Sequence, residues 1–437
     1  MTSSAGWAAA AHLVRSTGFG AAGDLVDAVA AAGPSSWLEA SLRAAPESDS
    51  GAVASPAPSF EAPPPLPQDA SREDRQRRRQ QETDKVARLV AWWIRRMVAV
   101  ENPLVEKLTF GWHNHFATSA TKVRSAPMLS AQNATLRATG RGRFTNLAEA
   151  MVVDPALLLW LDGQQNTVKA PNENLSREFM ELFTLGRSGG YTEQDVREGA
   201  RALTGWTLDR QEGTATFVPR RHDTEPKTVL GTTANLDAIG FVGVLLKQPT
   251  SAPFVATRWW QLLAGPTAPP SDALDRMVAA YGPERDLAAL FRAMLTDGAY
   301  AATAGSLVVS PVEWVVGAMR SLHVTTDDDT VKKVVGAMRA LGQLPFFPPN
   351  VSGWPSGQAW LSTASATTRV QTAAFLARAG HLETVQDAPA SGRVDVVAHL
   401  LGIPALSNRT LAELTAHTND PQRLVAMALV SPENLVI

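Results

Sequence analysis

Histidines, carboxylates and cations gather in three short segments of the sequence. The first segment, Phe110-Gly-Trp-His-Asn-His-Phe116, contributes His113 and His115. Imidazoles act as general acids and bases or as metal ligands. On a helix, residues two apart point roughly 200° away from each other, so this pair cannot chelate one ion unless the segment is extended. The competing interpretation is two imidazoles that are hydrogen-bonded in or near the core.

The second segment, residues 171–186, predicts a helix with a polar stripe. Asn174, Glu178 and Glu181 follow each other at i, i+4 and i+7, and Arg177 lies beside them. Two carboxylates one turn apart suit a shared metal or an acid/base pair if their face is buried. If the face is exposed, the same residues form an ordinary solvated ladder.

A second helix follows this segment after a short connection. Thr192-Glu-Gln-Asp195 resembles a capping box, with Arg197 and Arg201 one turn apart behind it. The short connection predicts an antiparallel helical hairpin, in which Glu178 and Glu181 could face those arginines. Such an arrangement favours a structural network of ion pairs over an open metal site.

The third segment is Pro219-Arg-Arg-His-Asp-Thr-Glu-Pro-Lys227, which we expect to be a loop. It brings His222 and Asp223 together with Arg221 and Lys227. This mixture suits an anionic or phosphorylated ligand, or a histidine oriented by an acid. An adjacent His-Asp pair also arises often by chance, so a purely structural loop is the alternative.

An aromatic-rich stretch at residues 342–360 is the fourth candidate. It holds four prolines, three glycines and the two tryptophans Trp354 and Trp360. Exposed indole rings could stack on a sugar ring or grip a peptide. The alternative is that the loop plugs the side of a helical core.

Composition excludes several classes of protein. The 437 residues include 40 Lys plus Arg and 42 Asp plus Glu, a net charge of -2, so the basic balance of a nucleic-acid binder is missing. The absence of cysteine excludes disulfide scaffolds, thiolate metal sites and thiol nucleophiles. No motif for nucleotide binding, zinc proteolysis or α/β-hydrolase chemistry occurs. No metal is therefore assigned, and any cofactor is unknown.

Helical periodicity dominates the rest of the chain. We expect an all-α, multi-helix globular fold over residues 1–437, a single domain with one minor β-hairpin around the turn Gln211-Glu-Gly213. Residues 46–71 are rich in proline and predict an extended linker or surface insert. The arginine-rich run that begins at Arg72 leads into a strongly amphipathic helix and is interpreted as a solvated helix start.

Neither a signal peptide nor a membrane span is expected. The N-terminal 20 residues contain no Lys or Arg before Arg15, and they predict a first helix. The most hydrophobic stretches elsewhere are interrupted by charged residues and are too short to cross a bilayer. We therefore expect a protein of the cytoplasm, or one that is exported in complex with a partner that bears a signal.

A series of motifs follows in order along the chain: Gly111-Trp-His-Asn-His-Phe116, Asp154-Pro-Ala-Leu-Leu158, Leu161-Asp-Gly163, Asn172-Glu-Asn-Leu-Ser-Arg-Glu-Phe-Met-Glu-Leu-Phe-Thr-Leu-Gly186, Tyr191-Thr-Glu193, Ala202-Leu-Thr-Gly-Trp206, Arg221-His-Asp223 and Pro348-Pro-Asn-Val-Ser-Gly-Trp-Pro355. With these motifs in this order, the chain resembles a bacterial family catalogued as domain of unknown function 1800. The resemblance implies a neighbour: such proteins are often encoded beside a second family, domain of unknown function 1501, whose members resemble sulfatases and commonly carry export signals.

Two functions are compatible with these observations. The first is a helical binding or scaffold partner of the sulfatase-like protein, in which protein–protein interaction replaces catalysis. The alternative is a hydrolase or transferase that acts on an envelope glycan or a phosphorylated group. Its catalytic candidates are His113, His115, Glu178, Glu181, His222 and Asp223, and its ligand-binding candidates are Asn174, Arg177, Arg221, Lys227, Trp354 and Trp360. The binding role is preferred because no catalytic signature occurs; whether the protein is an enzyme stays open.

Overall fold

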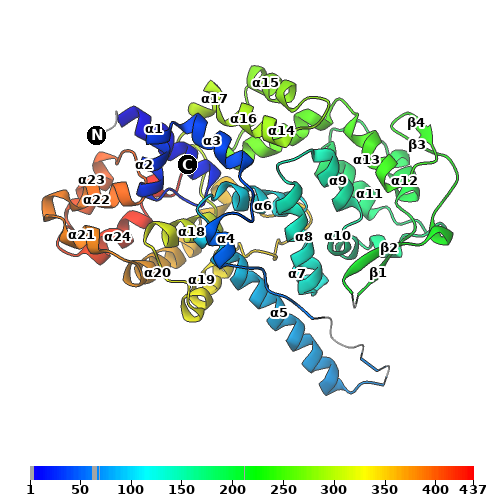
Figure 1. Ribbon diagram of the computed structural model, residues 1–437, viewed down its shortest axis with the longest axis horizontal. Helices are drawn as coiled ribbons and strands as arrows, with labels where there is room; N and C mark the ends of the chain where they lie inside the picture. The colour runs from blue at the N-terminus through cyan, green and yellow to red at the C-terminus, as the bar shows by residue number, and fades with distance from the viewer. Residues whose placement is uncertain (1–3, 62–65, 68, 211) are drawn as a thin grey trace.

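Two hydrophobic cores, which meet along one central helix, organise the molecule. The computed structural model describes residues 4–61, 66–67, 69–210 and 212–437. In those ranges the chain forms 24 α-helices and two small antiparallel sheets, so the predicted all-α fold is confirmed. The helices α20 to α24 lie at one end of the molecule, near α1 and α2, and both β-hairpins lie at the other end (Figure 1). The assignment of residues 1–437 to one domain stays a prediction.

The first core gathers helices from the N-terminal and middle parts of the chain. Its helices before the insert are α1 (Ser4–Thr17), α2 (Gly23–Ala32) and α3 (Pro34–Arg43). Its later elements are α9 (Phe144–Val152), α10 (Pro155–Trp160), α11 (Asn174–Glu178), the π-helical turn η2 (Phe179–Thr184), α12 (Glu193–Ala202), α13 (Ala238–Leu246), α14 (Ser251–Leu263), α15 (Ser271–Tyr281), α16 (Leu287–Leu295) and α17 (Gly298–Ala301). Gly33, with a positive φ of 84°, separates α2 from α3, and Pro34 begins the next helix.

The second core lies mainly among C-terminal helices. Its elements are α7 (Ala120–Val123), α8 (Ala126–Thr139), α18 (Pro311–Ser321), α19 (Asp328–Ala340), α20 (Thr363–Ala379), α21 (Glu383–Asp387), α22 (Arg393–Leu400), α23 (Asn408–Thr415) and α24 (Pro421–Leu429). Short 3-10 turns connect several helices: η1 (Gly163–Gln165), η3 (Pro219–Arg221), η4 (Gly357–Trp360), η5 (Ala390–Gly392) and η6 (Pro432–Asn434).

The central helix α6 (Leu104–His115) separates the two cores. Trp112 belongs to the first core and Phe110 to the second. Every residue of α6 except Asn114 is buried. Gly111 allows this close packing, because a Cβ atom there would lie 2.5 Å from the ring of Trp259 in α14. A helix that is buried all round cannot be recognised from an amphipathic pattern alone.

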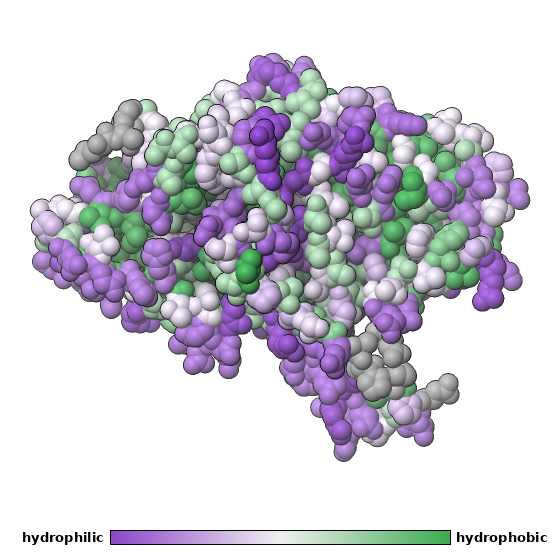
Figure 2. Space-filling model, viewed as in Figure 1, coloured by the Kyte–Doolittle hydropathy of each residue, from purple (hydrophilic) through white to green (hydrophobic). Residues whose placement is uncertain are grey.

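The long helix α5 (Arg72–Ala99) leaves the body of the molecule. Its C-terminal half packs into the second core through Trp93, Ile94 and Met97. Its N-terminal half extends away from the other helices, and hydrophilic residues cover its visible face (Figures 1 and 2). We call residues 72–85 the α5 arm. Within the described ranges, no helix combines the length and the apolar character that crossing a bilayer requires.

The insert at residues 46–71 differs in part from the extended linker that its prolines predict. Its beginning forms the short helix α4 (Ser50–Ala54), which is capped by the side chain of Asp49. Gly51 lies so close to α5 that a Cβ atom would stand 1.9 Å from the carbonyl oxygen of Ala99. Residues 47–55 contain no proline, because Pro56 is the next proline after Pro46, so nothing in this stretch prevents a short helix. Residues 62–65 and 68 lie outside the described residues.

Two β-hairpins interrupt the helices. The predicted hairpin is confirmed as β1 (Trp206–Asp209) and β2 (Thr214–Phe217), which pair antiparallel with Trp206 opposite Phe217; Gln211 in its turn lies outside the described residues. A second hairpin, β3 (Lys227–Val229) and β4 (Thr232–Ala234), was not predicted. Its strands have only three residues each, too few for an alternating pattern to stand out.

A buried carboxylate on α6 ties this helix to α5 and α8. Glu106 is 1% exposed, and its oxygens accept hydrogen bonds from Nε of Arg96 at 2.7 Å and Nε of Arg137 at 2.6 Å. Trp93 donates a further hydrogen bond to it at 2.7 Å. Burial raises the pKa of Glu106, but the two guanidinium groups outweigh burial and hold that pKa below its ordinary value. The carboxylate therefore stays charged inside the protein.

Replacing Glu106 with Gln should destabilise the protein strongly. The substitution leaves two buried guanidinium groups without a carboxylate, and breaking a buried pair in this way costs about 3–5 kcal/mol. The midpoint of urea unfolding measures the effect. The matched control is Glu39→Gln, because Glu39 pairs with Arg43 and Arg292 at the surface, and its midpoint should move little. Equal shifts in both variants would contradict the importance of burial.

Candidate functional site

His113 and His115 lie on opposite sides of α6, as helical geometry predicts. The ring of His113 faces the second core and packs against Phe346 and Trp354, at 5.2 and 5.5 Å between ring centroids. The ring of His115 faces the first core, 6.0 Å from the ring of Phe183. Both imidazoles are buried. They therefore share neither a ligand nor an ion.

Hydrogen bonds assign opposite neutral tautomers to the two imidazoles. Nε2 of His113 accepts a hydrogen bond from the backbone N–H of Phe346 at 3.0 Å, so its proton is on Nδ1. Nε2 of His115 lies 2.9 Å from the carbonyl oxygen of Phe183 and must donate. Burial lowers the pKa of each imidazole to about 3, and nearby Arg258 adds to this effect for His115. Neither pKa suits acid/base catalysis near neutral pH.

The loop between α19 and α20 closes against α6. Oδ1 of Asn114 accepts a hydrogen bond from the backbone N–H of Trp354 at 2.8 Å. Gly353, with a φ of 86°, lies so close that a Cβ atom would stand 2.2 Å from the same oxygen. Trp354 and Trp360 are each 5% exposed. Their rings lie inside the protein, as in the interpretation of this loop as a plug, and offer no stacking surface to solvent.

A small cavity remains where this loop meets α6. Its volume is about 60 Å³, and Lys107, Glu313, Gln343 and Trp360 are among its lining residues. Lys107 and Glu313 form an ion pair across it. Burial raises the pKa of Glu313, but Lys107 and the capping hydrogen bonds bring it below its ordinary value. The cavity has room for a few water molecules, whereas pockets for organic ligands measure roughly 300–1,000 Å³.

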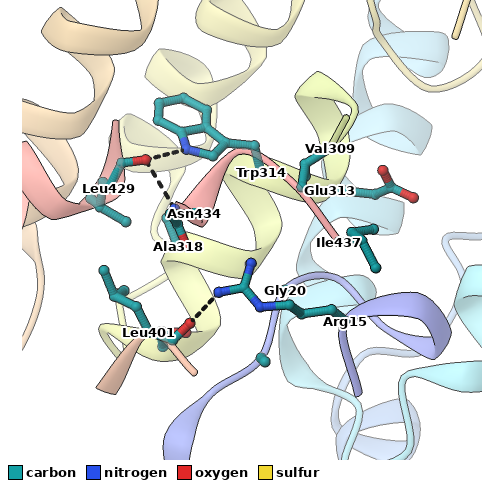
Figure 3. A pocket seen from close by; sticks show the side chains of 13 residues that line it. Arg15, Gly20, Val309, Glu313, Trp314, Ala318, Leu401, Leu429, Asn434 and Ile437 are labelled. Carbon is teal, nitrogen blue, oxygen red and sulfur yellow. Dashed lines mark hydrogen bonds between the residues drawn. The ribbon is translucent and has the colours of Figure 1, made fainter. Parts of the chain in front are cut away.

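A second small cavity lies between α1 and the C-terminal segment (Figure 3). The guanidinium group of Arg15 points into it and donates to the carbonyl oxygen of Leu401 at 3.0 Å and to that of Val436 at 3.1 Å. Burial lowers the pKa of Arg15 to about 10. The volume is only about 20 Å³, the size of one water molecule. This site fastens the two ends of the described chain and has no room for a substrate.

Glu178 and Glu181 lie where α11 changes into a π-helical turn. The turn is marked by the hydrogen bond from the backbone N–H of Leu185 to the carbonyl oxygen of Met180. Both carboxylates are half-buried. Burial, followed by the charge of Glu181, raises the pKa of Glu178. Glu181 pairs with Arg187 at 2.8 Å.

The predicted pairing of these carboxylates with α12 differs from the observed one. Arg177, not a glutamate, connects the two helices, and it binds Glu193 at 2.7 Å. Arg201 instead binds Asp223 and Glu198. The reason is the π turn, because side chains after Glu178 no longer follow the 3.6-residue spacing from which the stripe was derived. Asn174 is exposed, and its amide donates to the carbonyl oxygen of Leu161.

Asp223 and His222 are held by α12 and the residues after it. Arg201 binds both oxygens of Asp223, at 2.7 and 3.2 Å. Burial raises the pKa of Asp223, but the hydrogen bond from Arg201 contributes most to bringing it below its ordinary value. Nδ1 of His222 lies 2.9 Å from the carbonyl oxygen of Thr204 and donates to it. His222 and Asp223 are adjacent, yet Asp223 does not orient the imidazole.

The two cations predicted to bind an anion in this loop donate to oxygens of the protein itself. Arg221 donates to the carbonyl oxygen of Gln164 at 3.0 Å. Lys227 is buried, and its ammonium group donates to the side chain of Asn235 at 2.9 Å and to the carbonyl oxygen of Asp223. These contacts attach β3 to the preceding loop.

The catalytic candidates occupy separate surroundings. Glu193, which binds Arg177, and Arg201, which binds Asp223, are eight residues apart on α12, roughly 12 Å along its axis. Opposite ends of α12 therefore hold the carboxylates near Arg177 and the His222–Asp223 pair. His113 lies elsewhere, enclosed in the second core. Over the described ranges, no group of three or more His, Asp or Glu residues could hold a metal ion.

Comparison with known proteins places the chain in a family. The model of the family described as "Protein of unknown function (DUF1800)" matches residues 12–436. The chain belongs to this family. No curated protein and no solved structure matches it. In this DUF1800 chain, the motif around His113 and the motif around Trp354 contact each other at the boundary of the two cores.

A groove on the surface of this DUF1800 chain was not predicted from the sequence. It lies between α5, α7 and α19 and has a volume of about 590 Å³. Arg79, Arg124 and Arg339 are among its lining residues, together with apolar side chains such as Val90 and Phe347. Arg79 belongs to the run interpreted as a solvated helix start. Arg124 and Arg339 stand far apart in the sequence, so only tertiary structure brings them together.

The buried state of His115 predicts a loss of stability in acid. Its imidazole binds a proton near pH 6.5 in the unfolded chain but only near pH 3 in the folded protein. Between these values the unfolded chain holds more protons, so the free energy of unfolding decreases as pH falls from 6.5 towards 3. His115→Gln should lower this slope by about 1.4 kcal/mol per pH unit, measured by urea unfolding between pH 4 and 6.

The control for this experiment is His381→Gln, which alters an exposed imidazole and should leave the slope unchanged. Gln can still donate a hydrogen bond to the carbonyl oxygen of Phe183. The substitution therefore removes the group that binds a proton while the hydrogen bond can still form. An NMR titration of the folded protein in which the ring of His115 binds a proton between pH 6 and 7 would contradict the prediction.

Proposed function

We propose that this protein is a helical binding partner of another protein, and that the α5 arm is part of its docking surface. The observation that carries the proposal is the extension of residues 72–85 away from the body of the molecule (Figure 1). A helix half that buries no apolar side against its own chain gains little from folding alone. Contact with a partner would stabilise it.

The charge of the arm indicates the chemistry of the partner. Residues 72–79 contain five arginines and two acidic residues, so the outer turns of the arm are basic. An acidic protein surface complements this charge and would accelerate association. A nucleic acid fits less well, because no aromatic residue for base stacking occurs in residues 72–85 and the whole chain carries a net charge of -2.

The sulfatase-like protein of the second family is the partner that we propose. Its support is the bacterial family resemblance, in which the two kinds of protein are often encoded side by side. The complex would be in the cytoplasm, or outside it if the partner's export signal carries both chains. The alternative, a hydrolase or transferase, requires the imidazoles and carboxylates to share one pocket. We prefer the binding role because those side chains have separate, mostly internal partners.

Charge reversal in the arm tests this proposal. The full chain is expressed together with the sulfatase-like protein encoded nearby, and the complex is isolated through a tag on one of them. Arg72→Glu with Arg77→Glu should lower the affinity at least tenfold, measured by biolayer interferometry, because both side chains are exposed on the arm. Arg409→Glu with Arg423→Glu is the matched control, since it makes the same change of charge on α23 and α24.

Two outcomes would contradict the proposal. If the two wild-type proteins do not associate at any accessible concentration, the partner is wrong. If they associate but the arm variant and the control variant bind equally well, the arm is not part of the interface. Circular dichroism of both variants verifies that the fold is retained.

A further inference from the structure

We infer that the groove beside the α5 arm receives an acidic amphipathic helix of the partner. This inference rests on the proposed function and adds the structural class of the segment that binds. The groove is the one described above, between α5, α7 and α19, and we call it the α5 groove. The apolar floor of the groove, its charged rim and its length together indicate which ligand it binds.

The floor of the α5 groove is apolar. Val86 and Val90 of α5 line one side, and Leu344 and Phe347 of the loop after α19 line the other. Its volume of about 590 Å³ lies within the range of pockets that bind specific ligands, roughly 300–1,000 Å³. An apolar floor of this kind binds the apolar face of an amphipathic helix.

The rim is cationic, and its charges come from three different elements. Arg79 lies on α5, Arg124 directly follows α7, and Arg339 lies on α19. Arg124 donates to the carbonyl oxygen of Thr121 at 3.0 Å. In the part of the chain that the structure describes, none of these three arginines forms an ion pair with a carboxylate. They remain able to bind carboxylates of another molecule by charge-assisted hydrogen bonds.

The single acidic residue that lines the groove does not neutralise this rim. Glu82 pairs with Lys85 at 3.1 Å, and both side chains are only 20% exposed. Lys85 also donates to the carbonyl oxygen of Glu61. The negative charge of Glu82 is therefore balanced within α5, and the groove has an excess of positive charge.

The shape of the groove favours a helix over an amphiphile with one head group. Lining residues of α5 extend from Arg78 to Val90, roughly 18 Å along the helix axis, which is the length of about three helical turns. A second hollow continues past Thr121 and Arg124 towards Arg210. A single head group could engage one of the arginines, whereas a helix with several carboxylates along one side could engage all three.

A synthetic peptide tests the inference on the full chain. The probe is an 18-residue, fluorescein-labelled peptide with Leu on one helical face and Glu on the other, and its binding is measured by fluorescence anisotropy. The wild type should bind it, and Arg124→Glu with Arg339→Glu should weaken binding at least tenfold. Arg409→Glu with Arg423→Glu, which changes two exposed positions of α23 and α24, should bind as the wild type does.

A second variant excludes a fold defect or a general effect of charge. Ala87 is exposed and lines the groove, so Ala87→Trp should fill it without a change of charge and weaken binding similarly. A peptide of the same composition in which the order of Leu and Glu destroys the apolar face should bind at least tenfold more weakly. Dodecanoate serves as the amphiphile with one head group, and it should compete poorly.

The outcomes separate this inference from the proposed function. Any one of three results would overturn the inference. The two peptides could bind equally well, dodecanoate could bind tightly to the groove in place of the peptide, or both groove variants could bind the peptide as the wild type does. If the peptide does not bind while the sulfatase-like protein still associates, the groove inference fails and the proposed function stands. If the peptide binds as described but no sulfatase-like protein associates, the partner is wrong and the groove inference stands.

Discussion

The burial of α6 is the constraint on which the rest of the structure depends. A helix with four ionisable side chains can lie between two cores only if each polar group finds a partner there, because an unpaired buried charge costs several kcal/mol. Glu106 is paired with α5 and α8, Lys107 with α18, His113 with the loop after α19, and His115 with the π turn. These neighbours of α6 are thus held by specific polar contacts as well as by apolar packing.

In this arrangement several residues of catalytic type have partners inside the protein. The imidazoles are neutral and enclosed, and the Asp223 carboxylate is bound by an arginine. What the molecule presents to its surroundings is instead the basic α5 arm and the groove at its base. The same helix α5 serves both parts, because Arg96 and Trp93 fix its inner end to Glu106. Because the C-terminal end of α5 is anchored in this way, the direction of the α5 arm is fixed.

The sequence predicted the helical fold and much of the local geometry, but less of the site. Helical periodicity was sufficient for the all-α fold and for the divergence of His113 and His115. It failed at Glu181, because a π turn has no signature in a pattern with a 3.6-residue period. It also missed Arg124 and Arg339, which are distant in sequence and meet only in the folded chain. A single sequence predicts interactions between residues that are close along the chain, but it does not predict which distant residues will pair.

The contacts between α6 and the loop after α19 also bear on the synthesis of the protein. The bond from Phe346 to His113 spans 233 residues of chain, and the bond from Trp354 to Asn114 spans 240. At 5–20 residues per second, a ribosome needs roughly 12–48 s to make that length of chain. For this time the side of α6 with Phe110 and His113 has Trp93 of α5 beside it but lacks the rings of Phe346 and Trp354. The nascent chain therefore leaves part of this apolar surface exposed until residues 346–354 have been translated, and transiently exposed apolar surface of this kind is what chaperones bind.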